Sequence, residues 1–319
     1  MTKVLVTGGA GYIGSNVCKV LLQNGHDVRV FDDFSNGLES RLDGMDVEIV
    51  RGDILDRLAI IDAMHSMDSV IHLAAKKSVE ESVENPLKYY SNNFSGTLNV
   101  LAAMAIHKVR KIVFSSTAVV YASTNQDALR EDDPKNPLSP YADSKLLSEE
   151  VLALSLQAEG ISSVSLRYFN VVGAGGANLG DNARDNLVPK TFKALRSGGT
   201  PEIYGNDYQT HDGTCIRDYI HVVDLAEAHK LSLDLMNKGP AACVFNVGSG
   251  TGYTVTEMMN QMRESTGIDF EAKMMPRRSG DPEKLVADVS KINRELGWKP
   301  TSTLKEMIDS SWEAEKANA

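Results

Sequence analysis

The segment 141–145 contains a tyrosine and a lysine, Tyr141 and Lys145, that are four residues apart. On a helix, side chains at this spacing share one face. A nearby ammonium group favours the phenolate and so lowers the pKa of a tyrosine, as a general base requires. A packed tyrosine beside a solvated lysine would show the same spacing. The pair becomes a catalytic candidate only where other groups point to the same site.

Three hydroxyl residues, Ser115, Ser116 and Thr117, follow a run at 111–114 that predicts a strand. Ligands of parallel sheets bind at the carboxyl ends of the strands, so these hydroxyls are expected beside a bound cofactor. A hydroxyl at this place can relay a proton between Tyr141 and a substrate hydroxyl. The alternative role is a hydrogen bond that forms a turn.

Three glycines, Gly8, Gly11 and Gly14, are spaced by three between the first predicted strand and the first predicted helix. Glycines allow a tight turn and let backbone N–H groups approach a pyrophosphate at the helix N-terminus. An acidic pair, Asp32 and Asp33, begins 18 residues after Gly14. A carboxylate there accepts hydrogen bonds from the adenosine ribose and repels a 2′-phosphate. The pattern predicts a dinucleotide site that prefers NAD to NADP.

The elements that must position these residues alternate along the first half of the chain. Helical patterns, such as the one at 13–24, separate runs that predict strands at 4–6, 28–31, 47–50, 69–72 and 111–114. This alternation predicts an α/β fold, a Rossmann-like doubly wound parallel sheet. Just past the third predicted strand, Asp53 and Ile54 can flank an adenine, and Asp53 can also cap the next helix.

The regular alternation ends near Phe169, and a glycine-rich segment follows at 173–180. We therefore expect a Rossmann domain for the dinucleotide at 1–169 and a smaller, mixed α/β substrate domain at 170–319. The segment 215–236 again has a strand followed by a helical pattern. This pattern predicts that the chain crosses back to the first domain there.

The composition limits the classes of partner. The 319 residues include 33 basic and 43 acidic side chains, and the net charge of −10 argues against nucleic acid as the main partner. No apolar run reaches the roughly 18 residues of a membrane span, and the start lacks a signal-peptide pattern. The three cysteines are too few and too widely spaced for a disulfide framework or a metal site. We expect a cytoplasmic protein that binds neither a membrane nor a metal.

Taken in order, these motifs resemble those of the extended short-chain dehydrogenase/reductase superfamily over essentially the whole chain. Within it, the chain is similar to the epimerases that act on carbon 4 of UDP-glucose and UDP-galactose. So many ordered matches are more specific than any single motif. The matching stretches are 4–14, 52–54, 72–75, 81–97, 114–121, 139–145, 167–170, 213–221 and 277–281.

The resemblance implies a mechanism for three residues. Tyr141 would remove the proton from the sugar 4-hydroxyl while a hydride passes from carbon 4 to the nicotinamide of NAD. Lys145 would bind the nicotinamide ribose, and Thr117 would hydrogen-bond the 4-oxygen. The 4-keto sugar would turn and take the hydride back on its other face. NAD would therefore stay bound through turnover.

The resemblance also implies two sets of binding residues. NAD would contact Gly8, Gly11, Tyr12, Ile13, Gly14, Asp32, Asp33, Asn36, Asp53, Ile54, Leu73, Ala74, Ala75, Lys77, Asn92, Ser115, Tyr141, Lys145 and Phe169. The UDP-sugar would contact Thr117, Tyr141, Asn170, Asn186, Leu187, Tyr204, Arg217, Arg278, Asp281 and Leu285, mostly from the second, nucleotide-sugar-binding domain. Arg217 and Arg278 match positions that pair with the diphosphate, although surface salt bridges could also account for them.

Two departures from the family pattern concern the sugar. Thr117 stands where serine is usual, which keeps the hydroxyl and adds a methyl group. Leu285 stands where some epimerases carry a tyrosine that closes the sugar pocket. Leucine is smaller, so we hypothesise that the pocket also admits the N-acetylated sugars of UDP-GlcNAc and UDP-GalNAc.

Other functions share parts of this pattern. A UDP-glucuronate 4-epimerase, or another nucleotide-sugar 4-epimerase, would use Thr117, Tyr141 and Lys145 with a different sugar pocket. A non-catalytic NAD-binding sensor could keep the glycine turn and Asp32 without needing Tyr141 or Lys145. Nucleotide-sugar dehydratases and decarboxylases carry an acidic residue just after the strand-end hydroxyl, whereas residues 118–120 here are Ala, Val and Val. The UDP-glucose 4-epimerase type remains the preferred interpretation.

The resemblance also implies a homodimer. Its interface would pair the helices around 86–107 and 141–159 with their copies. Apolar side chains recur at spacings of three and four along the first of these segments, at Leu87, Tyr90, Phe94, Leu98 and Leu101. Packing on the chain's own sheet is the alternative use of this stripe, and some of these residues must serve it.

Overall fold

The computed structural model describes residues 2–121, 127–183, 185–278 and 281–317. Its main layer is a seven-stranded sheet with the order β10-β6-β5-β4-β1-β2-β3, and every neighbouring pair is parallel. The predicted α/β, doubly wound architecture is confirmed, and β1 to β5 contain the five predicted strands. The strands are β1 (Lys3–Thr7), β2 (Asp27–Asp32), β3 (Val47–Arg51), β4 (Ser69–His72), β5 (Lys111–Thr117), β6 (Ser162–Tyr168) and β10 (Ala242–Val247).

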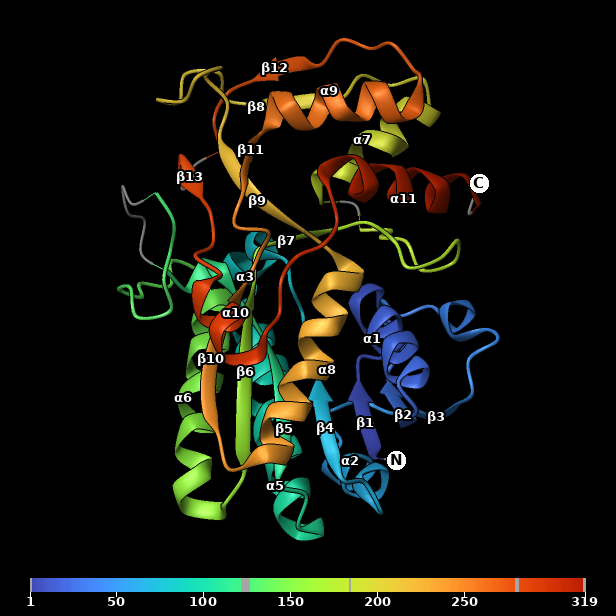
Figure 1. The fold of residues 1–319 in the computed structure, drawn as a ribbon, viewed down its shortest axis with the longest axis vertical. Helices are drawn as coiled ribbons and strands as arrows, with labels where there is room; N and C mark the ends of the chain where they lie inside the picture. Colours follow the sequence, from blue (N-terminus) through green and yellow to red (C-terminus); the bar gives the residue numbers. More distant parts are fainter. Residues whose placement is uncertain (1, 122–126, 184, 279–280, 318–319) are drawn as a thin grey trace.

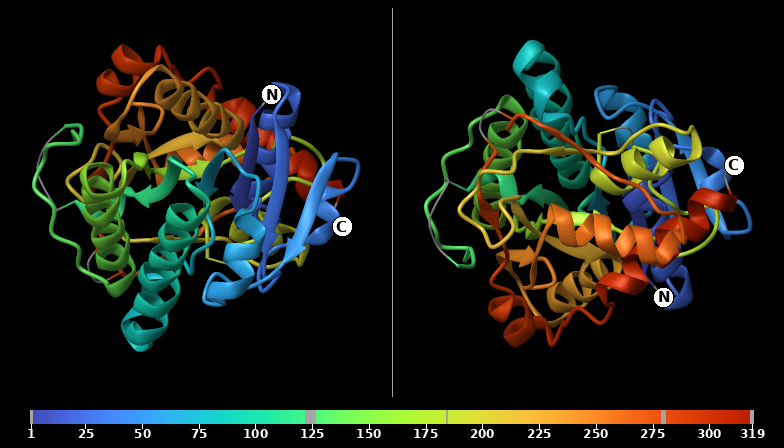
Figure 2. Two further views of the ribbon diagram at one scale, coloured as in Figure 1. Left: turned by 90° about the horizontal axis from the view of Figure 1, so that it is seen from below. Right: turned by 90° about the horizontal axis from the view of Figure 1, so that it is seen from above.

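Helices cover both faces of this sheet, and Figure 2 shows α8 and α5 on opposite sides of the strands. Strand β1 illustrates why, because successive side chains point to opposite faces. Val4 and Val6 belong to a buried cluster with one helix layer, while Leu5 belongs to a second cluster with the other. The first layer is α1 (Tyr12–Gln23), α8 (Val222–Lys238) and α10 (Ser290–Leu296); the second is α2 (Arg57–Met64), α5 (Gly96–His107) and α6 (Pro140–Glu159).

A second region lies above the ends to which the arrows of the main sheet point (Figure 1). Its sheet is built around β9 (Ile216–His221), which pairs with β7 (Asn170–Val172), β11 (Gly252–Thr254) and β13 (Lys284–Leu285). A further cluster of buried side chains joins this region to its helices. The remaining strands and helices of this second region are β8 (Glu202–Tyr204), β12 (Lys273–Met275), α7 (Leu187–Arg196), α9 (Val255–Thr266) and α11 (Leu304–Ala317).

The chain returns to the main sheet after it has entered this second region. Strand β10 pairs in parallel with β6, from Ala242 opposite Ser163 to Val247 opposite Tyr168. The division into domains at 1–169 and 170–319, with a crossing at 215–236, stays a prediction.

The helix expected over 86–107 is interrupted by a wider turn. The segment consists of α4 (Pro86–Tyr89), a π-helix at Tyr90–Ser95 and α5, and the short helix α3 (Val79–Glu84) precedes it. The π-helix places Asn93 inside the protein, where it bonds both backbone polar groups of Lys76 (2.8 and 3.0 Å) and the Ser144 hydroxyl (3.2 Å). The Asn93 amide thereby connects the loop after β4 to α6. Single π-helical turns of this kind are frequent at functional sites.

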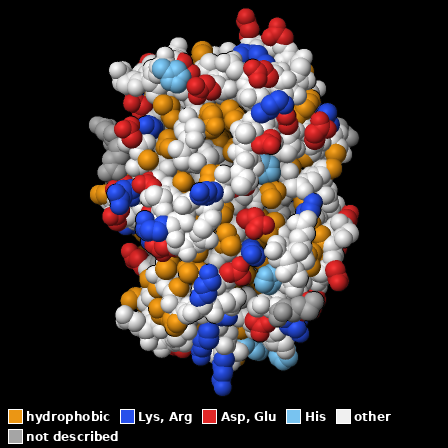
Figure 3. Space-filling model, in the orientation of Figure 1, with side chains coloured by type: hydrophobic (Ala, Val, Ile, Leu, Met, Phe, Trp, Pro, Cys, Tyr) orange, Lys and Arg blue, Asp and Glu red, His pale blue; other side chains and the backbone are white. Residues whose placement is uncertain are grey.

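The surface and composition add three observations. Within the described ranges, no helix is long and apolar enough to cross a membrane, and no cluster of three or more His, Cys, Asp or Glu side chains could hold a metal ion. The three cysteines are free thiols. Acidic and basic side chains are interspersed over the face that Figure 3 shows.

The contact between α1 and the preceding turn gives a first prediction. A Cβ at Gly14 would lie 2.1 Å from the Gly8 carbonyl oxygen. We expect Gly14→Ala to lower the free energy of unfolding by about 1–3 kcal/mol, as overpacking does, when measured by urea unfolding. Gly239→Ala is the control, because its Cβ would meet no atom within 4 Å. Equal stability of the two variants would contradict this packing.

Candidate active site

The turn between β1 and α1 is shaped to receive an anion. Gly8 has a φ of 73°, and a Cβ there would lie 2.7 Å from the Ala74 nitrogen. The Gly11 N–H donates to the Gly8 carbonyl at 3.1 Å. No side chain caps α1, and its first turn contains no acidic residue. The first-turn N–H groups and the positive end of the helix are thus left for a ligand such as a pyrophosphate.

A cavity of about 120 Å³ lies beside this turn. At its edge Asp32 is buried and accepts hydrogen bonds from the N–H groups of Ala10 (2.9 Å) and Phe34 (2.8 Å). Burial raises the pKa of Asp32, and these two hydrogen bonds oppose the shift. The cavity brings together predicted cofactor residues from several loops: Gly8, Gly11, Asp32, Asp33, Asn36, Asp53, Ile54, Leu73, Ala74, Ala75 and Asn92.

The expectation that Asp53 caps the following helix is wrong. Helix α2 begins at Arg57, and its cap is Asp56, which accepts from the N–H groups of Leu58 (3.0 Å) and Ala59 (3.1 Å). Asp53 instead accepts from the Leu55 N–H at 2.8 Å. Two aspartates three residues apart can each form such a turn, and the later one starts the helix.

A second cavity, of about 650 Å³, extends from the first turn of α1 into the second region. It collects most of the remaining predicted residues: Tyr12, Ile13, Lys77, Thr117, Tyr141, Phe169, Asn170, Asn186, Leu187, Tyr204, Arg217, Arg278 and Asp281. Gly14, Ser115 and Lys145 are buried and line neither cavity. Leu285 is not among the residues that line it, and packs with a separate apolar cluster that includes Tyr121 and Phe169.

The lysine of the predicted pair faces strand β5. Lys145 Nζ donates to the carbonyl (2.7 Å) and hydroxyl (3.1 Å) oxygens of Ser115 and lies 4.7 Å from the centre of the Phe114 ring. Burial lowers the pKa of Lys145 to about 7, and the Glu149 carboxylate opposes this shift.

Burial raises the pKa of Tyr141, and a hydrogen bond with Thr117 lowers it in part. The net shift is therefore upward, opposite to the expected fall of the Tyr141 pKa toward working pH, because desolvation is the larger effect. Ring contact with Tyr89, at 6.4 Å between centroids, holds the Tyr141 ring edge-on. Tyr141 lines the large cavity, where its phenol can donate or accept a proton.

The far end of the large cavity is rich in cations. Arg217 contacts Asp281 at 3.3 Å, and the Arg278 guanidinium lies 4.2 Å from the centre of the Tyr204 ring. Lys190, which was not predicted from the sequence, lines the cavity and donates to the Glu202 carboxylate (2.9 Å) and the Tyr204 hydroxyl (3.2 Å). A spacing of three residues from Leu187 puts Lys190 on the same helix face, and this signal could have revealed it.

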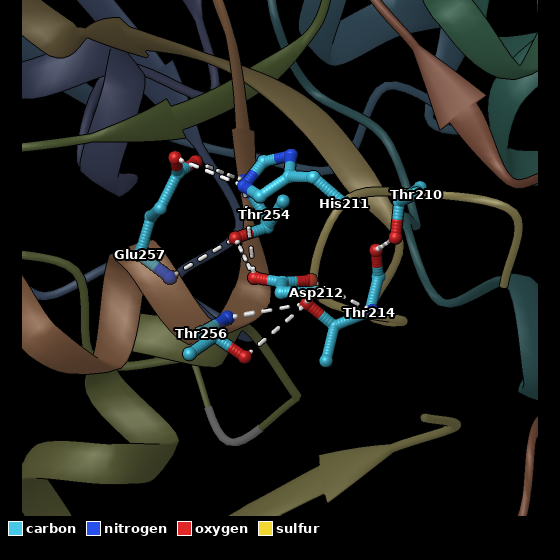
Figure 4. A network of polar contacts seen from close by, with 7 residues as sticks. All are labelled: Thr210, His211, Asp212, Thr214, Thr254, Thr256 and Glu257. Atoms are coloured by element: carbon cyan, nitrogen blue, oxygen red, sulfur yellow. Dashed lines mark hydrogen bonds and ion pairs between the residues drawn. The ribbon is translucent and has the colours of Figure 1, made fainter. Parts of the chain in front are cut away.

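A polar network holds the strand that carries Arg217 (Figure 4). Asp212 accepts hydrogen bonds from the Thr214 N–H (2.9 Å) and hydroxyl (2.8 Å) and from the Thr254 hydroxyl (2.6 Å). Thr254 also forms a reciprocal capping box with Glu257 at the start of α9. The turn before β9 is thereby fastened to a helix end, which limits the positions available to Arg217.

His72 lies at the end of β4 in the interior. Its ring nitrogens pair with the hydroxyls of Thr7 (2.7 Å) and Thr97 (3.1 Å). Burial, together with the nearby charge of Lys145, lowers the pKa of His72 to about 3. The ring is therefore neutral at ordinary pH and joins three elements below the cofactor turn.

Comparisons with known proteins agree with this geometry. A model of the NAD dependent epimerase/dehydratase family matches residues 4–248. The UDP-glucose 4-epimerase of Halalkalibacterium halodurans is 43% identical over 316 residues, which cover 97% of this chain and 94% of that protein.

Two solved structures are similar over nearly the whole chain. A UDP-glucose 4-epimerase from Stenotrophomonas maltophila, with bound NAD and formylated UDP-arabinopyranose, has a TM-score of 0.95 at 38% identity and covers 100% of this chain and 99% of its own. A UDP-glucose 4-epimerase from Brucella ovis in complex with NAD has a TM-score of 0.93 at 38% identity, with coverages of 98% and 97%.

The buried histidine gives a prediction about acid stability. In the unfolded chain His72 binds a proton near its ordinary pKa of 6.5, whereas in the folded protein it does so near 3. Stability is therefore lost as the pH falls below about 6.5, by about 1.4 kcal/mol per pH unit for this one group. Unfolding titrations between roughly pH 6 and 4 should show a shallower slope for His72→Gln, and an unchanged slope for the exposed control His65→Gln. Equal slopes for all three proteins would contradict the shift.

Proposed function

We propose that this chain, which belongs to the NAD dependent epimerase/dehydratase family, is an isomerase that interconverts UDP-glucose and UDP-galactose. The observation that carries the proposal is the large cavity. Its lining joins Tyr141 of α6 and Thr117 of β5 to Arg217 and Arg278 of the second region. A sugar joined to a nucleotide diphosphate has the matching arrangement of a reacting hydroxyl and a remote anion.

The residues present fit NAD. The turn from Gly8 to Gly14 leaves room and N–H groups for a pyrophosphate, and the Asp32 carboxylate lies where an adenosine ribose binds in this fold. When bound, NAD supplies a nicotinamide that accepts a hydride from carbon 4 of the sugar and returns it. Lys145, held on Ser115, would bind the nicotinamide ribose.

Tyr141 and Thr117 would handle the proton. In the first half of the reaction the Tyr141 oxygen takes the proton of the sugar 4-hydroxyl, and in the second half it gives the proton back. Thr117, which hydrogen-bonds Tyr141, holds the 4-oxygen within reach of the phenol. Because burial raises the pKa of Tyr141, the base depends on positive charge near it, which Lys145 and the oxidised nicotinamide would provide.

The nucleotide would be bound at the cationic end. Arg217 and Arg278 would hold the diphosphate, since a guanidinium group offers paired donors to phosphate oxygens. Each observed contact of Arg217, with Asp281 and with the Ile216 carbonyl, uses only part of its donor set. Asn170, Asn186, Leu187, Tyr204 and Asp281 would complete the nucleotide contacts.

Four narrower expectations stay predictions. A UDP-glucuronate 4-epimerase would share the catalytic residues, and a sensor would share the cofactor site. The hypothesis that Leu285 admits N-acetylated sugars finds no support in the cavity lining. A dehydratase stays disfavoured, because Thr117 is followed by the short 3-10 helix Ala118–Val120, which has no proton-transferring side chain.

We also propose that the protein is a cytoplasmic homodimer. Leu87, Leu98 and Leu154 are 79%, 39% and 66% exposed on the two helical segments assigned to the interface. Leu101, from the same predicted stripe, is instead buried in the chain's own core. Three free thiols suit a reducing compartment. Sedimentation of purified protein would test the dimer.

The activity itself can be measured without added cofactor. Purified protein should convert UDP-galactose to UDP-glucose with no NAD supplied, and denaturation should release stoichiometric NAD. Bound NAD without turnover of either substrate would move the assignment to another nucleotide sugar. Bound NAD without turnover on a wider panel, including UDP-GlcNAc and UDP-glucuronate, would favour the sensor.

Removing the phenol oxygen of Tyr141 tests whether the protein is a catalyst or only binds its ligands. We expect Tyr141→Phe to reduce kcat by about 100- to 10,000-fold, the usual contribution of acid–base catalysis, while NAD stays bound. Tyr90→Phe is the control, since that hydroxyl bonds Asp143 and does not line the large cavity. Wild-type turnover by the Tyr141 variant would exclude it as the base.

A further inference from the structure

The face of α6 that carries the catalytic pair continues to a third charged residue. Glu149 follows Lys145 by four residues and Tyr141 by eight, so all three lie along one side of the helix. The Glu149 carboxylate is 6% exposed and does not line the large cavity. It is therefore placed to act on the pair without touching the ligand.

Glu149 forms a two-pronged ion pair with Arg167 of β6. Arg167 Nη2 lies 2.6 Å from Glu149 Oε2, and Arg167 Nε donates to Oε1 at 3.0 Å. The third nitrogen, Nη1, donates to the Tyr121 hydroxyl (2.8 Å) and the Glu131 carbonyl (3.1 Å). Both charged side chains are almost wholly buried. Because a buried ion pair contributes little net stability over apolar residues of the same size, its presence calls for another role.

A further contact connects the Glu149–Arg167 ion pair to strand β5. The Ser116 hydroxyl donates to Glu149 Oε1. Ser116 stands between Ser115, which accepts from Lys145, and Thr117, which hydrogen-bonds Tyr141. One carboxylate thus joins α6, β5 and β6 at the level where the reacting groups meet.

We propose that Glu149, held by Arg167, is a positioning residue for the proposed epimerisation. It sets Lys145 and Thr117 in place relative to Tyr141, and it supplies the negative charge that keeps the buried Lys145 cationic. The proposal rests on the proposed function for its consequence in turnover, but not for its geometry.

The groups around Lys145 support the proposed electrostatic effect of Glu149 on Lys145. Ser115 and the Phe114 ring on β5 are uncharged, and His72 on β4 is neutral because its pKa is about 3. Glu149 opposes the fall in the pKa of Lys145 that burial causes.

Loss of the Glu149 carboxylate would change the pKa values of nearby groups in one direction. Removing a negative charge lowers the pKa of every nearby acid, including both the Lys145 ammonium and the Tyr141 phenol. The base would then form at lower pH, and the ammonium would also be lost at lower pH. Without the Glu149 carboxylate as its partner, the Arg167 guanidinium would lower these two pKa values further.

The test uses Glu149→Gln in the NAD-containing protein. We expect both limbs of the kcat profile to move toward lower pH by roughly one unit, so that kcat on the alkaline limb falls about tenfold, with KM for UDP-galactose within twofold. Glu150→Gln is the matched control, since it removes the same charge from the adjacent, exposed position. A profile that stays in place, or that moves equally in both variants, would overturn the electrostatic role.

A second readout does not require turnover. The tyrosinate absorbance that is lost in Tyr141→Phe titrates Tyr141 directly, and its midpoint should also move to lower pH in Glu149→Gln. A wild-type protein without epimerase activity would refute the proposed function yet leave this titration informative. An unmoved midpoint would overturn the inference even in an active enzyme.

Ser116→Ala covers the case in which Glu149→Gln does not fold. It keeps both charges and removes the bond between Glu149 and β5; because Ser116 also lines the large cavity, KM reports any direct effect on the ligand. We expect kcat to fall severalfold with KM and the pH profile unchanged. Unchanged kcat would overturn the positioning role.

Discussion

Lys145 carries an ammonium group that is almost wholly removed from water, and the rest of the site is arranged around this constraint. The carbonyl and hydroxyl of Ser115 bond the charge, and the Phe114 ring lies beside it. Burial brings the pKa of Lys145 to about 7, so small changes in nearby charge decide its protonation state. A group so poised can adjust the acidity of Tyr141 near neutral pH, which an exposed lysine would do weakly.

The main sheet provides this environment because its strands are parallel. Their carboxyl ends lie at one edge, which carries the glycine turn after β1, Asp32 at the end of β2 and Thr117 at the end of β5. The second region covers that edge and adds Arg217 and Arg278 at the far end of the same cavity. Two anionic ligands can therefore lie end to end, with the reacting sugar between them.

Local patterns were enough to predict the parallel sheet and the glycine turn, because each depends on short-range periodicity or on residue type. The pairing of Tyr141 with Lys145 stays a prediction. The cap of α2 was misplaced by three residues, since Asp53 and Asp56 are chemically equivalent in sequence. The pKa of Tyr141 was predicted in the wrong direction, because desolvation depends on packing that spacing does not describe. Glu149 and Lys190 were missed although each lies at helical spacing from a predicted residue, since their roles become visible only with partners far along the chain.

The central claim is that a hydride leaves carbon 4 of the sugar and returns to it from the same bound nicotinamide. UDP-galactose that carries deuterium at carbon 4 tests this claim most directly. Nuclear magnetic resonance of the UDP-glucose formed in ordinary water should show the deuterium retained at carbon 4. Replacement of the label by solvent hydrogen would contradict the account, because the hydrogen would then have left as a proton or through an exchangeable carrier.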